Sequence, residues 1–234
     1  MRFVSSDSVN CMKYMIKTVF GNPTDENTAT ADFVHYSKRI MRLLAEETSA
    51  TFPTRSITVN TPTNIRYKGQ LSIIDTNPEN VCLVSIIRAG DALLESFREL
   101  FPGATVGKLW IQRNESSADK EAIHRCTKLP PEIHEMGAVV LCDPMLATGG
   151  SSITALNTLV HEYGVKPERI VFANVISCPE GLDSLAKEFP EVKIVTAWVD
   201  EGLNEDKFIL PGLGDYGDRF FNTVRTPASM SRLL

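Results

Sequence analysis

The chain has 234 residues, of which 43% are hydrophobic and 23% are charged, and its formal net charge is −5. This composition is typical of a globular protein that needs no metal or disulfide to fold, and the acidic balance with scattered Lys and Arg argues against a nucleic-acid partner. Residues 1–10 lack the apolar core of a signal peptide, and no uncharged apolar run approaches the ~18 residues of a membrane span. We therefore expect a soluble, cytoplasmic protein with no membrane partner.

The five cysteines and four histidines follow no spacing that is typical of metal ligands or of a Cys/His catalytic pair. Three of the cysteines lie in apolar, strand-like runs, where we expect buried, unreactive thiols. The sequence therefore argues against a zinc enzyme and against a thiol enzyme.

The first part of the chain carries weak structural signals. Residues 1–30 are polar and predict an irregular N-terminal arm. From Thr30 to about Glu47 apolar residues recur every three or four positions, which predicts an amphipathic helix with Thr30 as its N-cap. Residues 58–75 are rich in β-formers and predict a short meander, broken at Pro62 and at Lys68-Gly69.

After residue 80, continuous apolar runs alternate with helical patterns. The predicted strands are Val81–Ile87, Ala138–Cys142, Arg169–Ile176 and Lys193–Trp198, and the predicted helices are Asp91–Phe101, Ser151 to about Tyr163 with Gly164 as the C′ residue, and Leu182–Glu188. Strands that are apolar on both faces and alternate with helices predict an α/β fold with a mainly parallel twisted sheet flanked by helices. No linker or repeat divides the chain, so we expect one domain over residues 1–234.

In such a sheet, ligands bind beyond the carboxyl ends of the strands, near the point where the strand order reverses. Two strand-to-loop junctions, at Arg88 and at Asp143, are therefore the expected places for chemistry.

The second junction has the composition of a phosphate-binding loop. It reads Asp143, Pro144, Met145, Leu146, Ala147, Thr148, Gly149, Gly150, Ser151. Backbone N–H groups of a Gly-rich turn at a helix N-terminus can encircle a phosphate, and the Thr148 and Ser151 hydroxyls add donors. Two glycines alone would equally fit a plain strand-to-helix turn. The strand-end carboxylate of Asp143, however, is placed to accept hydrogen bonds from sugar hydroxyls.

An acidic residue after an apolar strand, followed by Thr-Gly-Gly, resembles the signature of the type I phosphoribosyltransferases. Pro144 stands where most members carry a second acidic residue. In this respect the loop resembles that of the uracil branch of the family. The resemblance implies that residues 81–200 form a core that binds phosphoribosyl pyrophosphate through residues 143–151. It assigns Asp143 to the ribose 2′ and 3′ hydroxyls.

Two arginines resemble the pyrophosphate-binding groups of that family. Arg88, Ala89 and Gly90 match its pyrophosphate loop, in which a non-proline cis peptide is frequent, and Arg113 matches its second pyrophosphate-binding arginine. Planar guanidinium groups suit a pair of pyrophosphate oxygens. The resemblance implies that Arg88 and Arg113, with Asp143, carry catalysis by stabilising charge.

Near the C-terminus, residues 208–219 contain four glycines and a proline, and their composition alone would fit a surface loop. They resemble the uracil-binding hood of uracil phosphoribosyltransferases, which we assign to residues 201–224, with the N-terminal arm completing a small hood over the core. The resemblance implies that the backbone at Ile209, Gly214 and Tyr216 reads uracil. It places Asp215 at the phosphoribosyl pyrophosphate, directly or through Mg²⁺ and water.

The matches cover residues 81–223 in the family's order, with three departures. Gln112 replaces a residue that is often aromatic, Tyr216 stands where Ala or Phe is common, and residues 224–234 run past the usual end. The resemblance implies transfer of ribose 5-phosphate to uracil with Mg²⁺, in a homodimer or homotetramer, and it leaves open whether GTP is an effector. Two alternatives are a non-catalytic, pyrimidine-sensing regulator that binds RNA and an enzyme for orotate or a purine. The intact loops and the hood weigh against both.

Overall fold

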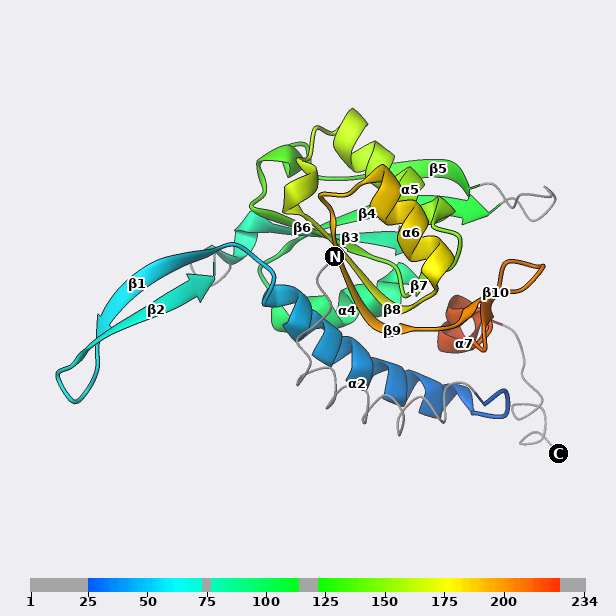
Figure 1. Ribbon diagram of the computed structural model, residues 1–234, viewed down its shortest axis with the longest axis horizontal. Coiled ribbons are helices and arrows are strands. Elements are labelled where there is room, and N and C mark those ends of the chain that lie inside the picture. The colour runs from blue at the N-terminus through cyan, green and yellow to red at the C-terminus, as the bar shows by residue number, and fades with distance from the viewer. Residues whose placement is uncertain (1–24, 73–76, 114–121, 224–234) are drawn as a thin grey trace.

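The computed structural model describes residues 25–72, 77–113 and 122–223. Its centre is a seven-stranded, mainly parallel sheet (Figure 1). The strands are β3 (Val81–Ile87), β4 (Thr105–Arg113), β5 (Ala122–Lys128), β6 (Ala138–Cys142), β7 (Met145–Leu146), β8 (Ile170–Ser177) and β9 (Lys193–Val199). The α/β fold expected from the sequence is confirmed.

The strand order is β5-β4-β3-β6-β8, with β9 paired to β8 and the short β7 paired to the carboxyl end of β8. From β3 the chain moves outward through β4 to the antiparallel edge strand β5, and then returns to β6 on the other side of β3. The strand order therefore reverses between β3 and β6. This is the position at which parallel α/β sheets bind their ligands.

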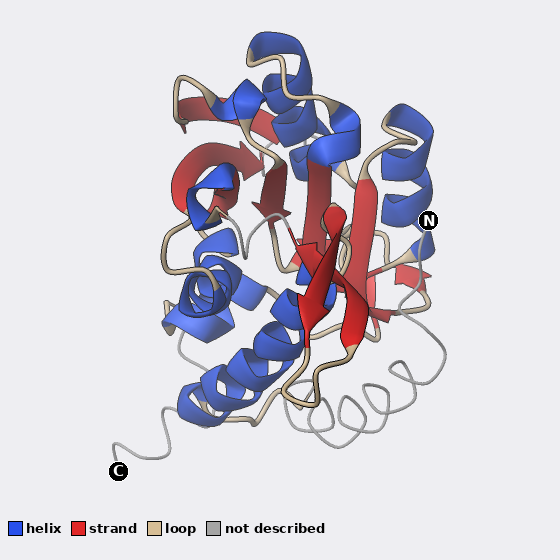
Figure 2. Ribbon diagram, turned by 90° about the vertical axis from the view of Figure 1, so that its left-hand side faces the viewer, coloured by secondary structure: helices blue, strands red, loops and turns tan. Residues whose placement is uncertain are grey.

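Helices cover both faces of the sheet (Figures 1 and 2). Two of them, α2 (Thr30–Ser49) and α4 (Gly90–Leu100), pack in one apolar core, and α5 (Gly150–Asn157) and α6 (Pro179–Glu188) pack in a second. Successive residues of a strand enter opposite cores, as Leu83 and Val84 do in β3. This explains why the central strands are largely apolar on both faces, with Ser85, Asn174 and Ser177 as buried polar exceptions in β3 and β8. Short helical turns lie at Pro78–Asn80, Ile133–Glu135, Thr158–Glu162 and Pro167–Arg169.

A two-stranded antiparallel hairpin, β1 (Thr54–Asn60) and β2 (Arg66–Ser72), projects from this body (Figure 1). The turn includes Pro62, as predicted. The predicted break at Lys68-Gly69 is wrong, because both residues lie within β2, where Gly69 pairs with Ile57. Over the described residues the expected meander is a hairpin, and it begins at Thr54, four residues earlier than expected.

Two further expectations about helices need correction. Thr30 is the first residue of α2 and not its N-cap, which is Ala29, and the Thr30 hydroxyl donates instead to the Asn222 side chain at 3.0 Å. The helix after residue 150 is α-helical only to Asn157 and continues as a π-helical turn to Glu162. Gly164 follows with φ +70°, as a C′ residue should. The strands β4 and β5 were not predicted, although Gly107, Leu109 and Ile111 of β4 are buried at every second position, as in a strand with one exposed face.

The C-terminal part forms three short elements, β10 (Gly202–Leu203), β11 (Ile209–Leu210) and α7 (Tyr216–Phe221). They lie next to the carboxyl ends of the strands, and α7 packs on α2 (Figure 1). The Tyr216 ring is buried and meets Phe33 of α2 edge to face, with 5.2 Å between the ring centroids. Of the predicted N-terminal arm, residues 1–24 lie outside the described residues. Among the described helices, none combines the length and apolarity needed to span a bilayer.

Candidate active site

A cavity of about 570 Å³ opens where the strand order reverses. The loops after β3 and β6 form one side of it, the end of β4 flanks it, and residues 207–217 close the other side. Its lining residues are Ile86, Ile87, Arg88, Ala89, Trp110, Ile111, Gln112, Asp143, Met145, Ala147, Ser151, Lys207, Phe208, Ile209, Gly214, Asp215, Tyr216 and Gly217. Three segments that are far apart in the sequence therefore share one cavity.

The loop after β3 is packed tightly against β6. A Cβ atom at Gly90 would collide with the carbonyl oxygen of Cys142, so only glycine allows this approach. The peptide bond between Ile87 and Arg88 is cis. It leads into the loop for which the resemblance implied that a non-proline cis peptide is frequent. Below the loop, Asp91 accepts a hydrogen bond from Ser85 Oγ at 2.6 Å. The loop is therefore held in place on the sheet.

Lys108 of β4 forms an ion pair with the same aspartate, with 2.8 Å between Lys108 Nζ and Asp91 Oδ2. This pair joins the start of α4 to the neighbouring strand. Arg88 lies three residues before Asp91 and lines the cavity.

The loop after β6 has the geometry of a strand-to-helix turn with its backbone N–H groups at the helix start. Gly149 is the N-cap of α5 and has φ +88°, the left-handed region that favours glycine. The first turn of α5 contains no acidic residue, and Ile153 donates the first intrahelical hydrogen bond, to the Gly149 carbonyl. The preceding N–H groups lack intrahelical acceptors, which makes this helix start suitable for an anion.

The cavity includes ten of the residues that the sequence assigned to ligands and leaves six outside its lining. Those in the lining are Arg88, Ala89, Asp143, Met145, Ala147, Ser151, Ile209, Gly214, Asp215 and Tyr216, and those outside it are Gly90, Pro144, Leu146, Thr148, Gly149 and Gly150. Asp143 is half-buried and aligns its carboxylate with the turn, since Met145 N–H donates to Asp143 Oδ1 at 3.4 Å. Arg113 is the last residue of β4. The side chain of Arg113 lies outside the described part of the structure.

Several lining residues were not predicted. Trp110 is half exposed at the end of β4, and Phe208 and Lys207 lie in the turn between β10 and β11. Lys207 has φ +65°, which is unusual for a residue with a Cβ. The only sequence signal for Phe208 was an aromatic residue next to a Gly-rich segment, and Trp110 was not placed because β4 was not predicted as a strand.

The turn between β11 and α7 is held by side chains that flank it. Asp200 accepts hydrogen bonds from Gly212 N–H at 2.9 Å and from the Trp198 indole at 2.7 Å. Gly212 has φ +63°, and a Cβ atom there would collide with the Ile209 carbonyl oxygen. The Arg219 guanidinium donates to the Leu213 carbonyl at 2.8 Å. These contacts give a Gly-rich segment a defined shape.

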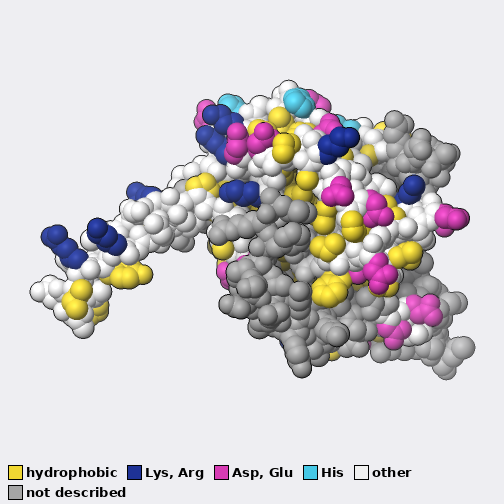
Figure 3. All heavy atoms as spheres, viewed as in Figure 1, with side chains coloured by type: hydrophobic (Ala, Val, Ile, Leu, Met, Phe, Trp, Pro, Cys, Tyr) yellow, Lys and Arg dark blue, Asp and Glu magenta, His cyan; other side chains and the backbone are white. Residues whose placement is uncertain are grey.

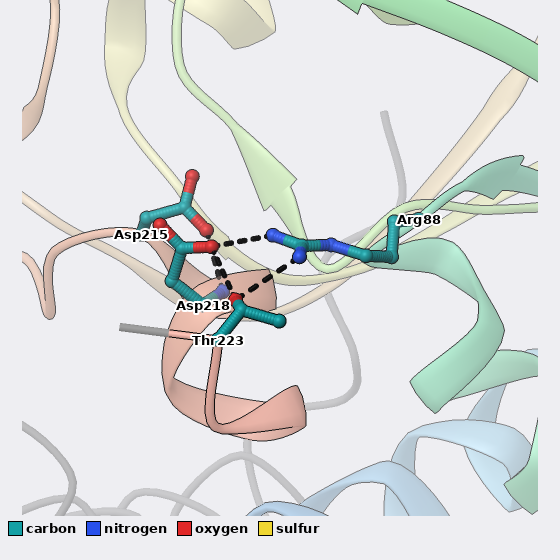
Figure 4. Close-up of polar contacts among 4 residues, drawn as sticks. All are labelled: Arg88, Asp215, Asp218 and Thr223. Atoms are coloured by element: carbon teal, nitrogen blue, oxygen red, sulfur yellow. Dashed lines mark hydrogen bonds and ion pairs between the residues drawn. The ribbon is translucent and has the colours of Figure 1, made fainter. Parts of the chain in front are cut away.

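Arg88 contacts α7 directly (Figure 4). Its guanidinium forms an ion pair with Asp218, with 2.5 Å between Nη2 and Oδ1, and donates to the Thr223 hydroxyl at 3.0 Å. The hydrogen bond from Thr223, followed by the charge and hydrogen bond of Arg88, holds the pKa of Asp218 below its usual value. Asp218 was not among the residues singled out in the sequence.

The thiols near the site are buried, as expected. Burial raises the pKa of Cys82 to about 12 and that of Cys178 to about 11, and it also raises the pKa of Cys142. Such thiols stay protonated at neutral pH and make poor nucleophiles. Cys126 is exposed on β5, and Cys11 lies outside the described residues.

Comparisons with known proteins agree with this arrangement. The family model described as "Uracil phosphoribosyltransferase" matches residues 13–223. The chain belongs to the uracil phosphoribosyltransferase family. A protein of Saccharomyces cerevisiae named "Uracil phosphoribosyltransferase" is 44% identical over 197 residues, which are 84% of this chain and 87% of that protein. One of the same name from Dictyostelium discoideum is 40% identical over 210 residues, or 90% and 93% of the two chains.

The fold of this family member also has a solved counterpart. The structure of the AQ2163 protein from Aquifex aeolicus superimposes with a TM-score of 0.73 and 30% sequence identity, over 94% of this chain and 97% of that one. The family resemblance read from residues 81–223 is thus confirmed, and with it the expected type I phosphoribosyltransferase fold.

The carboxylates of the site fit a substrate-bound Mg²⁺ better than a metal cage of the protein. Among the described residues, no group of three His, Cys, Asp or Glu side chains could enclose a metal ion. Asp143 and Asp215 nevertheless line the same cavity. Mg²⁺ is usually held by one or two carboxylates together with substrate phosphates and water, and Asp143 and Asp215 could supply the carboxylates of such a set.

Proposed function

We propose that this protein is a uracil phosphoribosyltransferase, which converts uracil and 5-phospho-α-D-ribose 1-diphosphate to UMP and diphosphate. Membership of the family supports this activity. The observation that carries the proposal is the single cavity shared by Arg88, Asp143 and the Ile209–Tyr216 segment. These are the groups assigned to pyrophosphate, ribose and base, and one substrate pair can touch all three.

On the phosphate side, the start of α5 supplies backbone N–H groups for the 5′-phosphate, with Thr148 and Ser151 hydroxyls beside them. Asp143, half-buried at the end of β6, accepts hydrogen bonds from the 2′ and 3′ hydroxyls. Its negative charge also favours the positive charge that develops on the ribose ring. Arg88 and Arg113 neutralise the pyrophosphate oxygens as the leaving group takes the bonding electrons.

We propose that Asp215 holds Mg²⁺, through water, at the pyrophosphate side of the cavity. When bound, Mg²⁺ supplies positive charge to the pyrophosphate oxygens. Asp215 is exposed and already accepts a hydrogen bond from Asp218 N–H at 2.8 Å, which fixes its orientation. To test whether activity requires Mg²⁺, pyrophosphate release can be measured while a chelator is added and again after Mg²⁺ is restored.

On the base side, main-chain groups at Ile209, Gly214 and Tyr216 present donors and acceptors to the edge of uracil. The Tyr216 side chain is directed into the core, where its hydroxyl lies 3.9 Å from Met41 Sδ, so this residue can contribute only backbone. Phe208 adds an apolar wall. Uracil N1 then bonds to C1 of the ribose and gives up its proton to water, while the bond from C1 to the pyrophosphate oxygen breaks and pyrophosphate leaves with the bonding electrons. Positioning accounts for most of the rate.

A base panel tests the proposal most directly. Uracil and 5-fluorouracil should release pyrophosphate in the presence of Mg²⁺, while cytosine, orotate and purines should be at least ~100-fold poorer in kcat/KM, because a buried donor or acceptor left unpaired is costly. Comparable rates with cytosine or orotate would contradict the base assignment. Absence of turnover with every base would favour the non-catalytic regulator.

We further propose that the protein is a cytoplasmic homo-oligomer. The β1–β2 hairpin exposes Val59, Ile65 and Tyr67, and its visible face in Figure 3 carries hydrophobic and basic side chains together. An isolated two-stranded hairpin is marginally stable in water, so a second subunit is a natural partner for it. Sedimentation of the parent and of a Tyr67→Ser variant tests the assembly. Addition of GTP to the same samples and to the assay tests whether GTP is an effector.

A further inference from the structure

Arg88 is held by a segment that lies 130 residues away in the sequence. Its Nη2 atom contacts Asp218 at 2.5 Å and its Nη1 atom contacts Thr223 Oγ1 at 3.0 Å. Both partners approach from α7 and the residue that follows its cap (Figure 4). The remaining N–H groups of the guanidinium are left for a ligand, and Arg88 lines the cavity.

Asp218 and Thr223 also bind each other, so that the three side chains form a ring of mutual contacts. The Thr223 hydroxyl donates to Asp218 Oδ1 at 2.6 Å while it accepts from Arg88. Asp218 N–H in turn donates to Asp215 Oδ1 at 2.8 Å, where Asp215 is the N-cap of α7. The direction of the guanidinium is therefore determined by the position of α7, and the same cap orients Asp215.

The backbone of α7 is shaped to admit this arginine. A Cβ atom at Gly217 would lie 3.2 Å from Arg88 Nη2 and 3.3 Å from Asp215 Oδ1, closer than ordinary contacts. The Phe221 ring lies on the other side, with its centroid 5.9 Å from Arg88 Cζ. The half-exposed arginine thus packs against the backbone of Gly217 and faces the Phe221 ring, in addition to its two polar contacts.

We propose that Asp218 and Thr223 are positioning residues that hold the Arg88 guanidinium in the orientation that binds the pyrophosphate of the substrate. The inference rests on the proposed function and adds to it that the base-reading segment also organises the pyrophosphate site. Long, flexible arginine side chains lose conformational freedom on binding a ligand, and contacts that fix the guanidinium beforehand reduce that loss. Binding of pyrophosphate therefore depends on α7, although α7 need not touch it.

Asp218→Asn is the sharpest variant, because it removes the charge and keeps the size and the backbone hydrogen bond to Asp215. The KM for phosphoribosyl pyrophosphate and the Kd for inorganic pyrophosphate, measured by calorimetry, should both rise about tenfold, as expected for a lost hydrogen bond between charged groups. The KM for uracil should change less than about twofold. Glu201→Gln, an exposed carboxylate of the same C-terminal segment, is the matched control and should leave all three constants unchanged.

Thr223 offers a conservative rescue. Thr223→Ser keeps the hydroxyl and should bind pyrophosphate like the parent, whereas Thr223→Val has the same shape without the hydroxyl and should weaken binding about threefold to tenfold. A purely structural role would instead lower the melting temperature and affect both substrates alike. Equal pyrophosphate affinity of the Val and Ser variants would count against the proposal.

A double-mutant cycle separates positioning from a general change of charge. In an Arg88→Gln background, Asp218→Asn should change the pyrophosphate Kd less than about twofold, because the group that it positions is gone. Multiplicative effects of the two substitutions, or tighter pyrophosphate binding by Asp218→Asn alone, would overturn the inference. If the parent showed no base-dependent turnover while the pyrophosphate effects held, the proposed function would fail and the positioning role would stand.

Discussion

The two sides of the cavity are built in different ways. The side that we assign to the phosphates, called the phosphate side, consists of short loops at the ends of β3 and β6, two buried neighbouring strands in the middle of the sheet. The side that we assign to uracil, called the base side, consists of two-residue strands and a six-residue helix. Elements of that size have little stability of their own, so this side keeps its shape through contacts with α2, with Asp200 and with Arg88.

This difference indicates where each side is vulnerable. On the phosphate side the functional groups are the weak points, because the sheet keeps its structure when one of them is changed. On the base side, residues that never meet the substrate should affect binding. Three substitutions test the contrast, in order of decreasing expected effect.

Asp143→Asn should have the largest effect. The variant should fold normally and lose about 100-fold or more in kcat, because the strand-end carboxylate faces the charge that develops on the ribose. Steady-state kinetics, together with a melting curve to confirm the fold, measure this. A folded variant with near-normal kcat would remove Asp143 from the catalytic groups.

Gly149→Val should have the second largest effect. A Cβ atom at Gly149 would lie 3.4 Å from the Gly181 carbonyl oxygen and from the Ser184 Cβ atom of α6, which is an ordinary contact distance. The cost therefore arises from φ +88°, which a β-branched residue tolerates poorly, by about 1–3 kcal/mol. Displacement of the loop should weaken binding of ribose 5-phosphate about tenfold or more, by calorimetry.

The matched control is Gly164→Val. Gly164 has φ +70° and lies after the π-helical turn, where an added Cβ atom would approach only the Cβ atom of His134, at 3.9 Å. This variant should lose similar stability and bind ribose 5-phosphate like the parent. If both variants lost binding equally, general destabilisation would explain the result and the loop would not be the phosphate site.

Asp200→Ala should have the smallest and most selective effect. It removes the acceptor for Gly212 N–H and the Trp198 indole, and the turn between β11 and α7 should loosen. We expect the KM for uracil to rise about tenfold, because hydrogen bonds to a charged group contribute about 1.5–3 kcal/mol, and the Kd for ribose 5-phosphate to stay within about twofold. Equal changes in both constants would mean that Asp200 supports the whole cavity and not the base side alone.

The sequence by itself determined the central strands, the loops that follow them and the family. Val81–Ile87 and Ala138–Cys142 were predicted to the residue, because a strand buried on both faces is almost continuously apolar, and Ser85 is the one polar residue in these two strands. The positions of Arg88 and Asp143 could be predicted as well, because each residue directly follows one of these strands and therefore lies at the carboxyl edge of the sheet. Gly149 and Gly164 could be recognised because a positive φ selects glycine.

Only the tertiary structure decided the rest of the site. Local sequence patterns could not show that Thr30 bonds Asn222 instead of capping its helix. They also could not show that Trp110 and Lys207 line the cavity, or that Asp218 holds Arg88. The physical reason is that these contacts join residues far apart in the chain, on elements too short or too polar to carry a periodic signal. Their partners become known only once the sheet has brought the two ends of the chain to the same edge.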